Sequence, residues 1–419
     1  MPTFQTSPGM RDIVPTESGR WRRFVSVFAE VAEAAGYGHL ITPLLEDAGV
    51  FTKVGEATDI VQKEMYRFTD VGGRDVSLRP EFTAAVCRSF VQIRPLTPWK
   101  VWLNGSNFRY ERPQRGRYRQ FDQVGVEVLG SDDADVDVEV IALGWRFFAR
   151  LGLQQVELLV NSLGQPEERA RYVDALHEHF TAHADALSEQ SVATLARNPL
   201  RVLDSKRAGD AEIIAAAPTI DRFYGTESGA HFERVTDGLA RVDVPFRVVP
   251  TLVRGLDYYV RTTFEFAGGT LDSAQNALGG GGRYDGLVAD LGGPATPGMG
   301  FGIGLDRTLL ACDDEGVFAA EPPTVDVFVV DTTGGSAALE LTDELRRLGL
   351  RADRAFDSRS MKSQMKAADR SGAATALIVG EDEMAAGTVV VRPLRGNGDQ
   401  TVIARRDIET LARPGQRPS

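Results

Sequence analysis

The sequence is short of the features that cross-link a protein or carry it through a membrane. Only two of its 419 residues are cysteines, Cys87 and Cys312, and they form no CxxC pair, which argues against a disulfide framework and against zinc. No run approaches the roughly 20 apolar residues that a membrane span needs. Residues 1–15 place Pro and polar side chains where a signal peptide needs an apolar core. We therefore expect a cytoplasmic protein with no membrane segment.

Common nucleotide-binding motifs are missing as well. The chain has no GxxxxGK[ST], so it has no P-loop. The glycine-rich run Gly298–Gly304 lacks the GxGxxG spacing, and no βαβ pattern surrounds it. Any nucleoside triphosphate must therefore be bound by another architecture.

A metal site is not indicated by the histidines either. On a helix, His179 and His183 share a face, but His177 points elsewhere, and the chain has no HExxH. We interpret the three as part of a solvated helix face and predict no metal ligands.

Lysine is scarce, because only 6 of the 47 basic residues are Lys and 41 are Arg. A single Arg is therefore weak evidence of a functional site in this chain. Only Arg residues in a chemically demanding arrangement indicate such a site. The net charge of −12 looks unfavourable for nucleic acid, yet screening limits each charge to about 10 Å, so a local phosphate-binding surface remains possible.

The length predicts two or three domains. Residues 17–36 and 133–150 have helical spacing, whereas 37–47, 100–111, 121–130, 155–162, 246–255 and 261–269 read as strands. Hairpin-like strand spacing with only occasional helices predicts an antiparallel α+β domain over residues 1–320. A helical insertion interrupts it at about 165–225. After a linker at 321–323, alternating strands and helices predict a separate α/β domain at 324–413 with a mixed or parallel sheet.

The most informative segment runs from Phe108 to Gly130. It carries five Arg between two predicted strands, and alternation puts Arg109 and Glu111 on one face. The returning strand places Phe121, Gln123, Gly125 and Glu127 on one face too. A guanidinium fork, carboxylates and a flat ring would converge on one pocket, where Arg can bind phosphate oxygens bidentately. An arginine-rich hairpin without a ligand is the alternative.

This segment resembles motif 2 of the class II aminoacyl-tRNA synthetases. Motif 3 of that class, a glycine-rich strand that runs into a helix through an Arg, is similar to GMGFGIGLDRTLLA with Arg307. Motif 1, which forms the dimer, is similar to GYGHLITPLLED with Pro43. Because all three occur in order, the resemblance is strong.

Further peptides resemble the histidyl-tRNA synthetase family. Residues 253–259, VRGLDYY, followed by RTTFEF, resemble its signature peptide, LRPEFTA at 78–84 its amino-acid-binding loop, and SMKSQMKAADRSGA its anticodon-binding domain. One departure is visible, since bacterial members usually read RPEGTA where this chain has Phe82. The resemblance covers essentially the whole chain.

The resemblance implies formation of histidyl-adenylate from ATP and histidine, then transfer to the 3′ end of tRNA(His). It places Arg109 and Arg254 on the α-phosphate and Arg307 on the γ-phosphate, with Mg²⁺ on the other phosphates. Glu111 and Phe121 would address adenine, and Arg117 the triphosphate. The implied assembly is a homodimer.

For histidine, the resemblance implies that Glu81 pairs with the α-ammonium group and that Thr83 and Gln123 add hydrogen bonds. The imidazole would be bound by Glu127, Tyr258 and Tyr259, beside the backbone at Phe82. Arg112 and Gln114 would face the tRNA acceptor end.

Two alternatives stay open on the sequence. One is a catalytically silent relative, such as the regulatory subunit of ATP phosphoribosyltransferase, although that protein lacks an anticodon module and loses signature residues. The other is a threonyl, prolyl or glycyl enzyme of the same class, against which the LDYY peptide argues.

Overall fold

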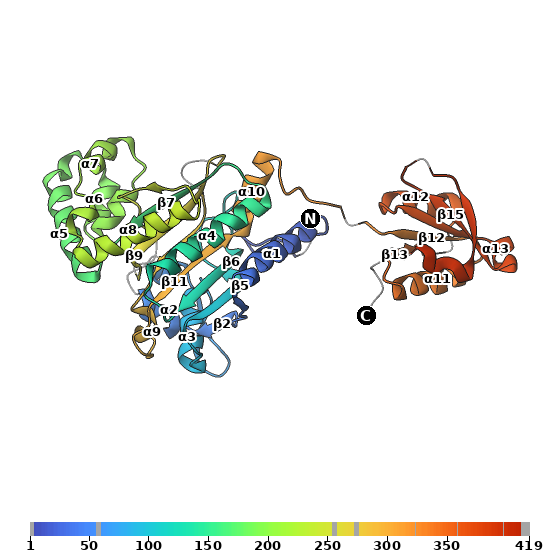
Figure 1. Ribbon diagram of the computed structural model, residues 1–419, viewed down its shortest axis with the longest axis horizontal. Helices are drawn as coiled ribbons and strands as arrows, with labels where there is room; N and C mark the ends of the chain where they lie inside the picture. The colour runs from blue at the N-terminus through green and yellow to red at the C-terminus, as the bar shows by residue number, and fades with distance from the viewer. Residues whose placement is uncertain are drawn as a thin grey trace. The chain divides into compact units, whose positions relative to one another are not determined.

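The computed structural model describes residues 4–55, 60–253, 258–271, 276–322, 324–357, 359–396 and 398–411. The chain divides into two compact units (Figure 1). One consists of Met1–Ile13 and Arg20–Ala319, and the other of Ala320–Ser419 together with Val14–Gly19.

The first unit is built on an eight-stranded sheet with the order β1-β5-β6-β11-β10-β9-β7-β8. The pairs from β5 to β7 are antiparallel, whereas the outer pairs β1–β5 and β7–β8 are parallel. The predicted α+β class with an antiparallel sheet is therefore confirmed. The strands are β1 (Gly38–His39), β5 (Trp99–Phe108), β6 (Gln120–Leu129), β7 (Val156–Ser162), β8 (Arg247–Val248), β9 (Val260–Gly268), β10 (Ala277–Arg283) and β11 (Gly298–Gly304).

The strand expected at 246–255 is much shorter than predicted. Only Arg247–Val248 pair with β7, and residues 254–255 lie outside the described part of the chain. Pro250 has no N–H to offer a sheet. Beyond β8, the Asn161 side chain instead donates to the carbonyls of Pro250 and Leu252, at 3.1 and 3.0 Å.

Helices α1 (Glu17–Ala34), α4 (Ala134–Leu151) and α8 (Thr226–Arg241) belong to one face of this sheet (Figure 1). Alternation along β6 turns Val124, Val126 and Val128 into the core under these helices. The intervening residues therefore face the opposite side, which is the side of the site described below.

That opposite side carries α3 and a small three-stranded sheet with the order β2-β4-β3. The segment around Pro43 separates β1 from β2, so the strand predicted at 37–47 is split between two sheets. Further elements of the first unit are β2 (Leu45–Asp47), α2 (Gly49–Gly55), a π-helical turn (Ile60–Glu64), β3 (Tyr66–Thr69), β4 (Asp75–Leu78), α3 (Thr83–Ile93) and α9 (Leu287–Asp290). Helix α10 (Leu305–Glu315) packs in the core with α1 and α4.

Between β7 and α8 the chain is helical, in short pieces. These are α5 (Pro166–Ala182), α6 (Glu189–Leu195) and α7 (Ala211–Ala215), with 3-10 turns at 184–186, 199–204, 208–210 and 220–223. Buried Asp210 joins them by accepting hydrogen bonds from the hydroxyls of Ser188, Ser191 and Ser205, at 2.6–2.9 Å. No group of three or more His, Cys, Asp or Glu among the described residues is arranged to hold a metal ion.

The second unit has a mixed five-stranded sheet with the order β13-β12-β14-β15-β16. The first three strands in that order are parallel, and the last three are antiparallel. Separate apolar clusters cover its two faces. The elements are β12 (Val327–Asp331), α11 (Ser336–Arg347), β13 (Ala352–Arg354), α12 (Met361–Arg370), β14 (Thr375–Val379), α13 (Glu381–Ala386), β15 (Thr388–Pro393), β16 (Thr401–Ala404) and a 3-10 helix (Arg405–Leu411).

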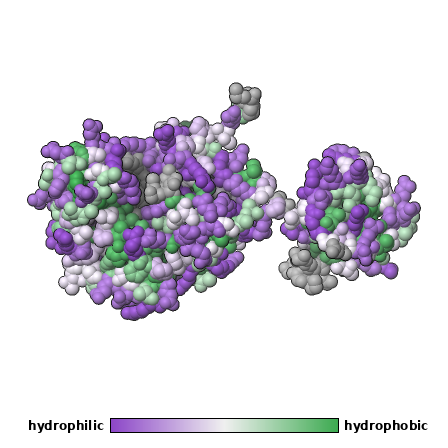
Figure 2. Space-filling view, turned by 90° about the horizontal axis from the view of Figure 1, so that it is seen from above, coloured by the Kyte–Doolittle hydropathy of each residue, from purple (hydrophilic) through white to green (hydrophobic). Residues whose placement is uncertain are grey.

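None of the helices in the described ranges is long and apolar enough to span a membrane. The face drawn in Figure 2 is largely hydrophilic over both units, with smaller hydrophobic patches between the charged side chains.

Candidate active site

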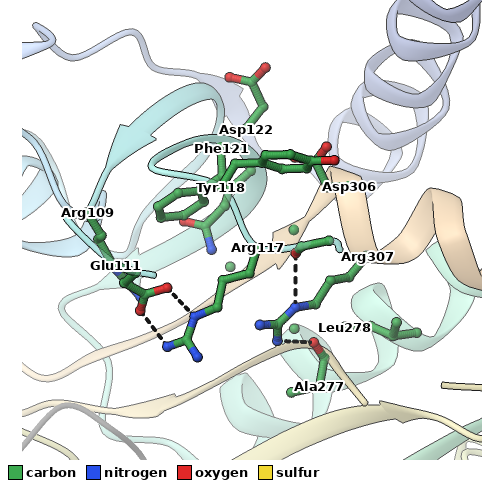
Figure 3. Close-up of a pocket in the computed structure, with 15 residues that line it drawn as sticks. Arg109, Glu111, Arg117, Tyr118, Phe121, Asp122, Ala277, Leu278, Asp306 and Arg307 are labelled. Carbon is green, nitrogen blue, oxygen red and sulfur yellow. Dashed lines mark hydrogen bonds and ion pairs between the residues drawn. The ribbon is translucent and has the colours of Figure 1, made fainter. Parts of the chain in front are cut away.

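A cavity of about 250 Å³ opens on the first unit, where β6, β10 and β11 meet the start of α10. The loop between β5 and β6 forms its other wall (Figure 3). It is lined by Arg109, Glu111, Gly116, Arg117, Tyr118, Phe121, Asp122, Gln123, Ala277, Leu278, Gly279, Gly302, Gly304, Asp306 and Arg307. The structure thus brings together the five residues predicted to bind ATP.

Three guanidinium groups face this cavity, each in a different setting. Arg117 forms an ion pair with Glu111 across the loop (Figure 3). Arg307 donates to the backbone carbonyls of Gly116 at 3.2 Å and Ala277 at 3.1 Å, and burial lowers its pKa. Three cations at one opening create a field that suits a polyanion.

Arg109 is oriented by the backbone and by a ring. Its Nε donates to the carbonyl of Pro80 at 2.9 Å, and its guanidinium carbon lies 5.2 Å from the centre of the Phe121 ring. The fork is therefore fixed before any ligand binds, which lowers the entropic cost of binding an anion.

Glycines alternate along β11, and the alternation has a steric cause. A Cβ at Gly300 would overlap the carboxylate of Glu127, and one at Gly298 would overlap the Tyr284 ring. A Cβ at Gly302 would lie 3.2 Å from the Gln123 amide nitrogen. The glycine face of β11 therefore leaves room for polar side chains, while Met299, Phe301 and Ile303 fill the core.

Glu127 lies behind the cavity and is 2% exposed. Its carboxylate accepts a hydrogen bond from the Thr83 hydroxyl at 2.6 Å and another from the Tyr284 hydroxyl. Burial raises the pKa of Glu127 to about 8, against the lowering effect of these two hydrogen bonds. A buried acceptor of this kind suits a ligand that brings N–H groups.

Glu81 is the second buried carboxylate. It accepts hydrogen bonds from the backbone N–H groups of Thr83 and of Ala84, the latter at 2.8 Å. Burial raises its pKa, and the positive charge of Arg109 opposes that shift. Thr83 thus donates to both carboxylates, to Glu81 from its backbone N–H and to Glu127 from its hydroxyl.

The side chain of Phe82 is buried in the core. It is 5% exposed and packs with Val86 and Phe90 in the core. The guanidinium carbon of Arg79 lies 4.6 Å from its ring centre. The backbone at 82 is right-handed helical (φ −91°, ψ −38°), which any residue adopts, so this position does not require glycine.

The other predicted site residues fall in three places. Tyr258 packs against Tyr259 and Tyr284, and its hydroxyl is buried. Arg112 and Gln114 are exposed on the turn between β5 and β6. Arg254 lies outside the described residues.

The sequence reasoning missed several contributors. Tyr284 directly follows the glycine-rich strand β10. This position in the sequence could have identified it as a candidate site residue. Tyr118 and Asp306 line the cavity, yet their residue types alone gave no reason to select them.

The family model of histidyl-tRNA synthetase matches residues 9–308. The chain belongs to this family. The anticodon binding domain model matches residues 324–413. Among similar curated proteins are the histidine–tRNA ligases of Rhodococcus erythropolis, 46% identical over 98% of this chain and 97% of the relative, and of Listeria innocua, 42% identical over 97% and 98%.

Two solved structures are similar to this chain. Apo histidyl-tRNA synthetase from S. aureus is 33% identical, with a TM-score of 0.81 over 98% of this chain and 100% of that one. A protein from Bacillus halodurans described as an ATP phosphoribosyltransferase regulatory subunit/histidyl-tRNA synthetase is 23% identical over 87% of this chain and 97% of its own, with a TM-score of 0.63, and shares the fold alone. Full-length similarity to the ligases favours the enzyme over the regulatory subunit.

Proposed function

We propose that this chain activates L-histidine with ATP and transfers the histidyl group to the 3′ end of tRNA(His). The observation that carries the proposal is that a cation-lined cavity and two buried carboxylates occur together. The arginine-lined cavity suits ATP, and buried Glu127 and Glu81 lie on the same side of the same sheet. Gln123 lines the cavity and lies on β6 two pleats from Glu127, so β6 connects the cavity with that buried carboxylate.

In the first step the histidine carboxylate attacks the α-phosphate of ATP, and pyrophosphate leaves. Arg109 and, by family resemblance, Arg254 neutralise the charge that builds on that phosphate, while Arg307 holds the γ-phosphate. Phe121 stacks on adenine and Glu111 accepts from its amino group, with Arg117 fixing Glu111 and facing the triphosphate.

Selection of histidine follows from the buried acceptors. Glu81 pairs with the α-ammonium group, and Thr83 and Gln123 add hydrogen bonds. Glu127 accepts from one imidazole nitrogen, and the hydroxyls of Tyr258 and Tyr259 serve the other. Analogues without those nitrogens leave buried polar groups unpaired, which rejects them by large factors.

Magnesium would fit this site if it is bound together with the phosphates of ATP. Of the cavity carboxylates, Glu111 is paired with Arg117, Asp122 accepts from Ser106 and Trp21, and Asp306 pairs with Arg11. The lining therefore suits an ion held mainly by phosphate oxygens, where it would neutralise charge on the departing pyrophosphate.

The second unit is proposed to bind the tRNA anticodon, and exposed Arg112 and Gln114 to face the acceptor end. Truncation after Ala320 is expected to retain histidine-dependent pyrophosphate exchange and to abolish tRNA charging. Circular dichroism and sedimentation would show that the truncated protein is folded. Equal loss of both activities in a folded protein would contradict this division of labour.

We also infer a homodimer. Around the segment that resembles motif 1, Ile41 is 78% exposed, Leu44 47% and Leu45 42%. Apolar side chains exposed together are typical of an interface. A stable monomer of about 46 kDa in sedimentation at micromolar concentration would rule the dimer out.

The deciding experiment is ATP–pyrophosphate exchange with each amino acid in turn. Exchange that depends on histidine, with charging of tRNA(His), is the expected result. Exchange with threonine, proline or glycine would indicate another specificity, and no exchange at all would indicate the regulatory alternative.

A further inference from the structure

The segment Ser7–Arg11 lies against the loop that walls the cavity. The carbonyl of Gly9 accepts a hydrogen bond from the backbone N–H of Arg119 at 2.8 Å. Gly9 has a φ of +79°, and a Cβ there would lie 2.7 Å from Cγ of Arg119. Glycine at this position therefore lets the segment approach the loop closely.

Arg11 extends this contact to the cavity wall. Its guanidinium carbon lies 5.2 Å from the ring centre of Tyr118 and 5.6 Å from that of Trp21. Its terminal nitrogen forms an ion pair with Asp306 at 3.0 Å. Tyr118 on the loop and Asp306 at the start of α10 both line the cavity and are labelled in Figure 3.

Trp21 ties the same assembly to β6. Its indole N–H donates to Asp122 at 3.0 Å, and the other carboxylate oxygen of Asp122 accepts from the Ser106 hydroxyl at 2.5 Å. Arg11 thus joins the loop, the start of α10 and α1 at one point, through one planar cation.

We propose that Ser7–Arg11 is a clasp that holds the cavity in its ATP-binding shape, with Arg11 as a positioning residue for ATP. The proposal deepens the proposed function and rests on it. Without the clasp, the loop has to be ordered when ATP binds, and that ordering reduces affinity. Arg11 also offsets the charge of Asp306, which otherwise faces the incoming phosphates.

The contacts of the clasp lie at the cavity and none of those described reaches Glu127 or Thr83. Loss of Arg11 is therefore expected to weaken the binding of ATP and to leave the binding of histidine unchanged. This separation distinguishes a positioning role from a general effect on folding.

The test is pyrophosphate exchange by full-length variants, with the KM for ATP and for histidine measured separately. Arg11→Ala is expected to raise the KM for ATP about tenfold and to change the KM for histidine less than twofold. Arg22→Ala, which removes an exposed arginine from α1, serves as the matched control and should change neither. Arg11→Lys keeps the charge but loses the planar stacking, so it should fall between wild type and Arg11→Ala.

A second variant tests the charge of Asp306. Asp306→Asn in the Arg11→Ala background should recover part of the ATP affinity, because a neutral amide then replaces the negatively charged carboxylate. An unchanged KM for ATP in Arg11→Ala, or an equal rise in both KM values, would overturn the clasp.

Direct titration of the same variants with ATP alone separates the two proposals. A wild-type protein that binds ATP but exchanges no pyrophosphate with histidine would refute the proposed function. The ATP dissociation constant of Arg11→Ala would still decide the clasp, with an unchanged value refuting it.

Discussion

Tyr284 donates a hydrogen bond to Glu127, although the two residues stand 157 positions apart in the chain. Both are buried, and Gly298 and Gly300 on β11 provide the space that they occupy. The hydrogen bonds from Tyr284 and Thr83 orient the Glu127 carboxylate before a ligand binds. The orientation is fixed by packing, which is what selective recognition of a small polar substrate requires.

Glu127→Ala is expected to damage histidine binding far more than ATP binding. The imidazole loses its acceptor, and the hydroxyls of Thr83 and Tyr284 lose theirs, at a cost of about 1–3 kcal/mol. The KM for histidine should rise about 10- to 100-fold in pyrophosphate exchange. Glu178→Ala, an exposed site in the helical insertion, is the control. Equal changes in both KM values would argue against this placement.

Glu127 should also make stability depend on pH. Its pKa of about 8 in the folded protein exceeds the ordinary value of 4.5, so the folded state binds this proton more tightly than the unfolded state. The stabilisation is fully present below about pH 4.5 and is lost as the pH rises through about 8. Urea unfolding should therefore show a steeper loss of stability between pH 5 and 9 for wild type than for Glu127→Gln. Parallel pH profiles would contradict the shift.

Phe82→Leu is expected to lower the free energy of unfolding by about 1–2 kcal/mol, because it keeps most of the apolar burial and removes the ring beneath Arg79. Urea denaturation of Phe82→Leu, Arg79→Met and the double variant gives the interaction energy of the pair. A coupling of about 0.5–2 kcal/mol is expected. Additive effects would mean that the ring contributes only its packing.

Arg254 remains a prediction of the sequence. Arg254→Ala removes a fixed cation from the reacting phosphate, and the loss of a comparable group lowers rates about 10²–10³-fold. Pre-steady-state adenylate formation should fall by that factor, while histidine affinity changes much less. A folded variant that activates histidine at close to the wild-type rate would refute the placement of Arg254 on the α-phosphate.

The sequence predicted the antiparallel sheet well because its strands alternate over many residues. Residues 100–111 and 121–130 became β5 and β6 within two or three positions at each end. The strand at 246–255 failed at Pro250, where tertiary hydrogen bonds from Asn161 replace a ladder. Gly279, Gly281 and Gly282 lie within β10, where the neighbouring strands leave no room for a side chain.

The site was predictable where its residues belong to a recognisable local motif. One hairpin carries Arg109, Glu111, Arg117 and Phe121. Strand alternation predicted that they converge on one pocket, and all four line the cavity in the structure. The partnership of Arg11 with Asp306 joins residues 295 positions apart, and nothing local marks either one. Long-range pairs of this kind depend on the packed fold and not on a motif.

The separation of Arg11 and Asp306 sets an order of events during synthesis. Asp306 is made 295 positions after Arg11. At about 5–20 residues per second, a ribosome needs roughly 15–60 s to make that length. The arginine-rich loop is therefore made, and stays on the nascent chain, well before the segment that completes its cavity. A newly made chain can bind ATP in this cavity only after synthesis has passed Asp306.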